Sequence, residues 1–397
     1  MATYSVEPKV LIWAREECGL SFDQAVDDLK PHLAKEDPSS RLADIEAGKQ
    51  PPTLSLLAAM SRVYNVSLVT LFWPSPPPRT EKPTDYRTIR GQAPTLSKAT
   101  LLAIRNTVRW QATMMELVQD VPELYQPLDL PTVALRDDPA RIADSERLRL
   151  GVTFEEQRKL KDANQAFNLW RWRIEDHGIL VFALSMPLTD CRGFVFDGGS
   201  NIPAIVVNKQ DDAAAQVFTL FHEYAHILLR QFGICGHSRD VDEREVETFS
   251  NSFAANFLMP TDEVIEQAEL NSIDRHADIE IVLDAIPTMT RCFKVSGEAM
   301  VLRLEALRLA PYGLHSEYIR RMRVRKPRRG FGDGKSFHRR YLNKLGNRYV
   351  ETVLTALRHG SINAAEADDM MDGVKGRHFR ELEIELANRR KEYGFVR

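Results

Sequence analysis

The stretch His222-Glu223-Tyr224-Ala225-His226 decides how the central part of this sequence is interpreted. It matches H-E-x-x-H and lies within an apolar segment that has neither proline nor glycine, as expected for a helix. Residues four apart share one helix face, so the two imidazoles can converge on one metal ion. A carboxylate at position 223 then lies beside a water molecule that the metal polarises, where it can accept and pass on a proton. The alternative is a helix with two surface histidines, but their apolar neighbours would bury them without a partner.

A third protein ligand is needed to complete such a site. The extended pattern H-E-x-x-H-x-x-G-x-x-H fails, because Leu229 and Phe232 occupy its glycine and third histidine positions. A glutamate on the following helix is the alternative. Glu247 shares a helical stripe with Asn251, Ala254 and Leu258, so we expect it to turn inward. Two further glutamates compete and are expected to be solvated, namely Glu243 and Glu245. We expect one Zn²⁺ per chain, although this ligand set also suits Mn²⁺ or Fe²⁺.

Two blocks of sequence carry these residues, HEYAHILL at 222–229 and ETFSNSFAANFLMP at 247–260. They resemble the ImmA/IrrE metallopeptidases, whose second block reads E-x-x-A-N-x-F-A-x-x-L-L-M-P. The sequence departs at Ser250, where the family usually has Ala, and at Phe257, where Leu is usual. The resemblance implies that His222, His226 and Glu247 bind zinc and that Glu223 is the general base.

The resemblance also implies a fold and a function. The fold is mainly helical α+β, a zincin-like domain with a small sheet and the H-E-x-x-H helix, in which an edge strand holds an extended substrate. Residues 204–208 are expected to be that strand. The implied activity is an intracellular endopeptidase that cleaves a protein substrate, a helix-turn-helix transcriptional repressor, in stress response or mobile-element control. A non-hydrolytic DNA-binding regulator or antitoxin-like protein with a metal- or ligand-sensing domain stays open, although the intact Glu223 argues against it.

The oxyanion-stabilising group is left unassigned, with Tyr224, His237 and Arg239 the nearest candidates in sequence.

Around the motif, the pattern predicts helices and strands in a definite order. Long helices are expected at 98–117 and at 154–174 after an N-cap at Thr153, then a meander of short strands at 178–183, 193–196 and 204–208. Helices at 213–232 and 241–258 follow, the second stopped by Pro260, and the helical segment 264–309 is expected to break at Pro287 and to contain a tight turn within 290–300.

The N-terminal segment predicts a small all-helical unit, with helices at 10–18, 21–29, 39–46 and 54–64. Residues 11–21 and 42–54 resemble the Cro/repressor-like helix-turn-helix domains of the XRE family. That resemblance implies a DNA-facing surface at Ser39, Ser40, Arg41 and Lys49. The connection at 30–37 is longer than the usual turn, and the segment carries few basic residues. DNA binding and a protein-interaction or dimerisation role, hence a homodimer, therefore both stay open.

Composition and charge bound the remaining possibilities. The chain has 397 residues with a formal net charge of −3, so nucleic-acid binding would need a local basic patch. The four cysteines form no C-x-x-C pair, and no apolar run reaches the about eighteen residues that cross a bilayer. We expect a cytoplasmic protein without membrane contact. The expected domains are 1–73 (helix-turn-helix), 74–97 (proline-rich linker), 98–265 (zincin-like), 266–310 (helix-turn-helix-like) and 311–397 (a basic loop, with eleven Lys or Arg within 320–344, and C-terminal helices).

Overall fold

The structure is a computed structural model that describes residues 3–33, 37–77, 96–122, 128, 130–197, 202–231, 243–324 and 337–393. The chain divides into two compact units. The first contains residues 1–82, 88–108 and 185–190, and the second contains 83–87, 109–184 and 191–397. Most of the expected linker at 74–97 lies outside the described residues. No described helix is long and apolar enough to cross a membrane.

The first unit contains the four expected N-terminal helices. They are α1 (Pro8–Glu17), α2 (Phe22–Leu29), α3 (Pro38–Glu46) and α4 (Leu54–Tyr64). Local capping explains where they begin: the Ser21 hydroxyl accepts from the Gln24 backbone N–H in a capping box, and Asp37 and Thr53 cap α3 and α4. The Arg15 guanidinium donates two hydrogen bonds of 2.7 and 3.0 Å to Glu46, which ties α1 to the end of α3.

A three-stranded sheet forms the centre of the second unit. Its strands are β1 (Leu180–Leu184), β2 (Gly193–Phe196) and β3 (Ala204–Asn208), in the order β1-β3-β2. β3 pairs parallel with β1 and antiparallel with β2, so the expected meander is wrong. The prediction of 204–208 as an edge strand is also wrong. All five of its residues are buried and it has a partner on each side, whereas β2 pairs only with β3 among the described strands.

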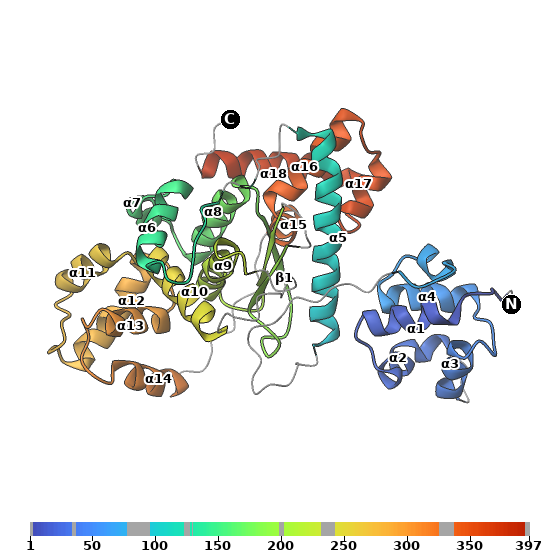
Figure 1. Cartoon of the computed structure of the whole chain (residues 1–397), viewed down its shortest axis with the longest axis horizontal. Coiled ribbons are helices and arrows are strands. Elements are labelled where there is room, and N and C mark those ends of the chain that lie inside the picture. Colours follow the sequence, from blue (N-terminus) through green and yellow to red (C-terminus); the bar gives the residue numbers. More distant parts are fainter. Residues whose placement is uncertain are drawn as a thin grey trace. The chain divides into compact units, whose positions relative to one another are not determined.

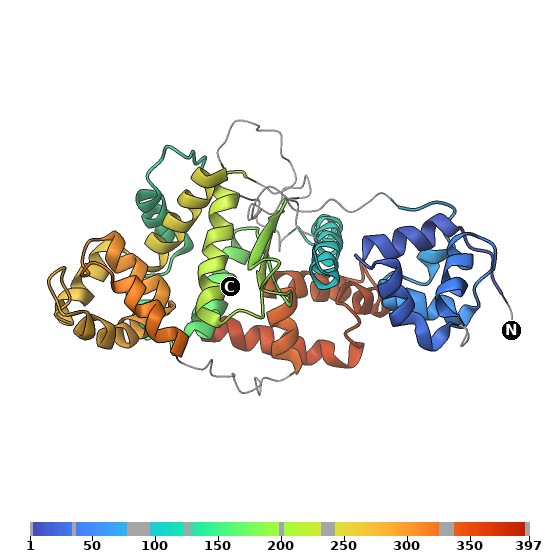
Figure 2. The same cartoon turned by 90° about the horizontal axis from the view of Figure 1, so that it is seen from below.

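Helices cover both faces of this sheet, which is why its strands are continuously apolar. On one face, Val181 and Ala183 join the core formed with α8 (Ala163–Asp176) and α9 (Ala213–Leu228). On the other, the Phe182 ring packs 4.9 Å from Trp110 of α5 (Lys98–Asp120) and 5.9 Å from Tyr349 of α16 (Asn347–His359), measured between ring centroids. Figure 1 and Figure 2 show the strands between α9 and α5.

Two expected helix boundaries are wrong for identifiable reasons. The helix expected at 154–174 is split into α7 (Phe154–Lys159) and α8, because Asp162 accepts from the Gln165 backbone N–H and starts a new helix. The Thr153 cap is confirmed, as part of a capping box. Pro287 does not break the chain but lies inside α12 (Ile279–Phe293). The apolar face of α12 is buried on both sides of it, and this packing outweighs the roughly 3 kcal/mol that an interior proline costs.

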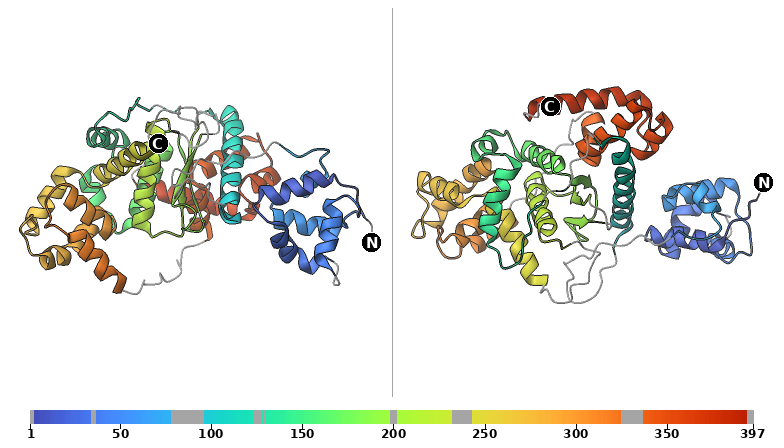
Figure 3. Two further views of the ribbon diagram at one scale, coloured as in Figure 1. Left: turned by 60° about the horizontal axis from the view of Figure 1, so that its bottom comes forward. Right: turned by 45° about the horizontal axis from the view of Figure 1, so that its top comes forward.

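The remaining helices complete the second unit, and Figure 3 shows the helices from residue 337 onward, coloured orange-red to red, as one group. Part of the expected basic loop is helical, and its residues 325–336 lie outside the described ranges. The helices not yet named are α6 (Pro139–Leu150), α10 (Glu243–Leu258), α11 (Thr261–Leu270), α13 (Gly297–Ala306), α14 (Leu314–Val324), α15 (Phe337–Leu345), α17 (Ala364–Met370) and α18 (Phe379–Glu392).

A buried charged network joins these C-terminal helices to α8. Arg171 and Glu175 form an ion pair of 3.1 Å, and both side chains are almost completely buried. The Glu175 carboxylate also accepts hydrogen bonds from the backbone and side chain of Asn347, whose amide oxygen accepts one from Arg389. The C-terminal region is therefore an integral part of the second unit.

Candidate metal centre

Helix α9 is buried along most of its length and presents two different faces. Its N-cap is Asp212, whose carboxylate accepts from the Ala215 backbone N–H. One face carries aromatic side chains into the core, which α10 shares, and the other carries His222 and His226 toward Glu247 of α10. Both histidines and Glu223 are buried, with 3–6% of each residue exposed. This burial restricts the movement of the three side chains.

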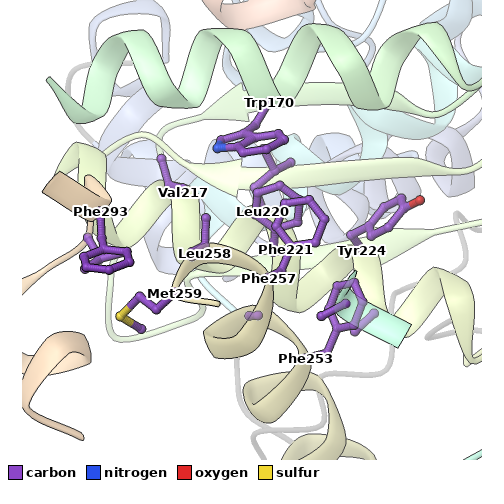
Figure 4. Close-up of a cluster of buried hydrophobic side chains, with 14 of the residues drawn as sticks. Trp170, Val217, Leu220, Phe221, Tyr224, Phe253, Phe257, Leu258, Met259 and Phe293 are labelled. Carbon is purple, nitrogen blue, oxygen red and sulfur yellow. The ribbon is translucent and has the colours of Figure 1, made fainter. Parts of the chain in front are cut away.

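An aromatic cluster sets the packing of α9 on α10, as Figure 4 shows. The rings of Phe221 and Phe257 stack with centroids 3.9 Å apart, and the edge of Trp170 meets both rings at 5.0–5.2 Å. Phe253 lies 6.1 Å from Tyr224. Such packed contacts allow little sliding of one helix along the other, so the position of the α10 side chains opposite the two histidines is determined by the core.

The structure brings His222, His226 and Glu247 together. The two Nε2 atoms are 3.2 Å apart, and the Glu247 carboxylate oxygens lie 3.5 Å from Nε2 of His222 and 3.6 Å from Nε2 of His226. Ligand atoms bound tetrahedrally to zinc at about 2.0–2.1 Å are separated by about 3.3 Å, so the observed separations fit such a site. Among the described residues, this is the one group of three or more metal-binding side chains close enough to share an ion.

The electrostatics also suit a metal ligand. Partial burial raises the pKa of Glu247, but hydrogen bonds to His222 and His226 and their charges outweigh this effect and bring the pKa below its usual range. Glu247 is therefore ionised at neutral pH, the form in which a carboxylate binds a metal. Its competitor Glu245 is exposed, as expected, and the side chain of Glu243 lies outside what the structure describes.

A contact that the sequence analysis did not assign lies next to these ligands. The Nδ1 atom of His222 is 3.0 Å from the amide oxygen of Asn251, which follows Glu247 by one helical turn. The sequence could have indicated this contact, because Asn251 is four positions after Glu247 and therefore lies on the same face of the helix.

Glu223 lies beside the edge strand β2. A Cβ atom placed on Gly193 would come within 3.1 Å of the Glu223 carboxylate and within 2.8 Å of the Val206 carbonyl oxygen. Only glycine fits this position without displacing its neighbours. Among the described strands, β2 therefore lies beside the motif helix and has an outer edge without a strand partner.

Tyr224 lies between the candidate site residues in sequence but has a different environment. Its hydroxyl donates a 2.6 Å hydrogen bond to Glu146 of α6 and accepts one from Arg149. The side chain is fully buried, so it anchors α9 to α6 and is a poor candidate for stabilising an oxyanion. The other candidates, His237 and Arg239, lie outside the described residues.

Hydrogen bonds from other helices hold the C-terminal end of α10. Its last carbonyl groups have no partner within the helix, and three buried side chains from other helices donate to them. The donors are Arg147 to Phe257 O (2.8 Å), Gln157 to Leu258 O (3.0 Å) and Arg303 to Met259 O (3.1 Å). Burial lowers the pKa of Arg147 to about 10, which leaves it charged at neutral pH. These contacts hold the C-terminal half of the Glu247 helix in place.

The expected DNA-facing residues lie on the first unit. Ser39 and Ser40 are exposed at the start of α3, and Lys49 is exposed 3.8 Å from Asp44. Arg41 is half-buried, with a long 3.4 Å hydrogen bond to Pro51 O. At the start of α3, the Asp37 carboxylate accepts a hydrogen bond from the Ser40 backbone N–H.

Fold and site together define a domain of the H-E-x-x-H metallopeptidase type. Residues 174–305 match the M78 peptidases, described as the IrrE N-terminal-like domain, and the chain therefore contains such a domain. The matched segment includes all three strands, the helix with both histidines and the helix with Glu247. It does not reach the N-terminal helices, whose assignment to a helix-turn-helix family stays a prediction. No match was found among curated proteins.

Proposed function

We propose that this protein is a zinc-dependent endopeptidase that cleaves a protein substrate, with His222, His226 and Glu247 as the metal ligands. The observation that carries the proposal is the convergence of these three side chains, from two helices, at ligand distances inside a matched M78 domain. A zinc ion bound there supplies a Lewis acid and lowers the pKa of water. Glu223 is the side chain that transfers the proton. It is buried one residue after the first ligand and can accept and return a proton.

The edge strand β2 is the proposed place for the substrate backbone. An extended peptide can add to an unpaired edge through main-chain hydrogen bonds. The absence of a side chain at Gly193 supports this role, since it brings the strand close to the Glu223 carboxylate. Peptide bound along β2 would lie within reach of the proton acceptor.

We propose that the substrate is a helix-turn-helix transcriptional repressor and that cleavage relieves repression in stress response or mobile-element control. The small helical N-terminal unit supports this role in one of two ways. It contacts DNA through Ser39, Ser40, Arg41 and Lys49, or it binds the repressor; either raises the effective concentration of substrate near the peptidase domain.

Metal content and cleavage test the proposal together. Purified wild type should contain about one zinc per chain by mass spectrometry, and His226→Ala and Glu247→Ala should each lose it. Glu223→Gln should keep the metal but fail to cleave a candidate repressor that wild type cleaves. Wild type without metal after reconstitution would refute the site. A Glu223→Gln protein with full regulatory activity would instead support the non-hydrolytic regulator.

A further inference from the structure

We infer that Asn251 is a positioning residue that selects the tautomer of His222 and so prepares its Nε2 atom for the metal. The inference rests on the proposed metal site. The contact that carries it is the 3.0 Å separation between His222 Nδ1 and the Asn251 amide oxygen.

The chemistry of that contact determines where the imidazole proton lies. An amide oxygen only accepts hydrogen bonds, so the His222 Nδ1 atom facing it carries the hydrogen. When the ring is neutral, the lone pair is then on Nε2, the atom that lies 3.2 Å from His226 Nε2 and 3.5 Å from Glu247. With the opposite tautomer, a hydrogen would occupy Nε2 and block metal binding.

The Asn251 side chain is exposed, but packing sets the place of its backbone on α10. It lies one turn after Glu247 on α10, so one helix supplies both a metal ligand and the group that orients a second ligand from α9. The stacked rings of Phe221 and Phe257 and the hydrogen bond from Arg147 to Phe257 O hold the two helices against each other.

A neutral amide at this position has a measurable consequence. Partners of metal-binding histidines typically change metal affinity by about 10–100-fold when removed, because they fix ring orientation and raise ligand basicity. A carboxylate accepts the same hydrogen bond and adds negative charge, so it should favour the bound cation more than the amide does. Zinc affinity should therefore follow the order Asp, Asn, Leu at position 251.

The experiment compares full-length wild type with Asn251→Leu, Asn251→Asp and a control, Thr248→Leu, on the exposed side of the same helix. Zinc affinity is measured by competition with a chromophoric chelator. The tautomer of His222 is read from the ¹⁵N chemical shifts of its ring in metal-free protein, with His222→Gln for assignment. Thermal melting of the metal-free proteins shows whether each variant folds.

We expect Asn251→Leu to bind zinc about 10–100-fold more weakly, with a metal-free melting temperature close to that of Thr248→Leu. Asn251→Asp should bind zinc at least as tightly as wild type. Equal zinc affinity for wild type and Asn251→Leu would overturn the inference, as would an Nε2–H tautomer of His222 in wild type. Since the tautomer is measured without metal, a wild type that binds no zinc would refute the proposed function while the role of Asn251 is still decided.

Discussion

Tyr224 allows a clear test of which side chains near the motif are structural. It lies two residues after His222, which turns it to the other side of α9, where its hydroxyl contacts Glu146 and Arg149. Burial and the Glu146 carboxylate raise the pKa of Tyr224 well above its usual value, so the phenol keeps its proton at neutral pH. Tyr224→Phe removes this donor and leaves the ring contacts with Phe221 and Phe253 in place.

The size of the effect follows from what Glu146 retains. The substitution removes two hydrogen bonds to charged groups, one to Glu146 and one from Arg149. These two side chains keep their 2.6 Å ion pair, so neither charge is left unpaired, and we take the net loss as that of one such bond. Hydrogen bonds to charged groups contribute about 1.5–3 kcal/mol, and we expect the free energy of unfolding to fall by roughly this amount. For a unit of this size that corresponds to a decrease in melting temperature of roughly 3–12 °C.

The assay combines thermal melting with zinc content. Tyr224→Phe should melt at a lower temperature than wild type and bind the same amount of zinc, because the face of α9 that carries the candidate metal ligands is unchanged. A variant that melts like wild type would refute the structural role. One that melts normally but no longer cleaves a substrate would show that the hydroxyl acts in catalysis.

Three further substitutions test the packing around the site. The Ser250 hydroxyl is fully buried and has no hydrogen-bond partner among the described residues, so Ser250→Ala should raise the free energy of unfolding by about 1 kcal/mol, and a lower urea midpoint would contradict this. Gly193→Ala should lower the free energy of unfolding by about 1–3 kcal/mol, because the new methyl group meets a backbone carbonyl oxygen. Gly376→Ala, which meets only ordinary contacts, is the control and should change it by less than about 0.5 kcal/mol. Glu175→Ala leaves Arg171 buried without its ion-pair partner and should cost about 3–5 kcal/mol, measured by the same denaturation; a loss under about 1 kcal/mol would refute the role of the pair.

Features that depend on neighbouring residues could be predicted well. The capping groups Ser21 and Thr153 lie where the sequence places them, because an N-cap bonds a backbone N–H three residues away. The convergence of His222 and His226 needs only the helical repeat. Predicting Glu247 as the third ligand required more information, because helical periodicity had to be combined with the family resemblance of residues 247–260.

Features that depend on distant contacts could not be predicted in this way. The strand order β1-β3-β2 places 204–208 in the middle of the sheet, and no local pattern distinguishes a central buried strand from an edge strand of similar composition. The uninterrupted helix through Pro287 is a similar case. Burial of its apolar face outweighs the tendency of proline to end a helix.

By itself, the sequence predicted most of the helices, two of the candidate metal ligands and the candidate proton acceptor, because each of these rests on spacing within a few helical turns. Only the tertiary structure decided that Asn251 meets His222, that Gly193 lies against Glu223 and that α10 is held by Arg147. These contacts join residues that are 29 or more positions apart, and their partners are set by the packing of whole helices and strands in one core.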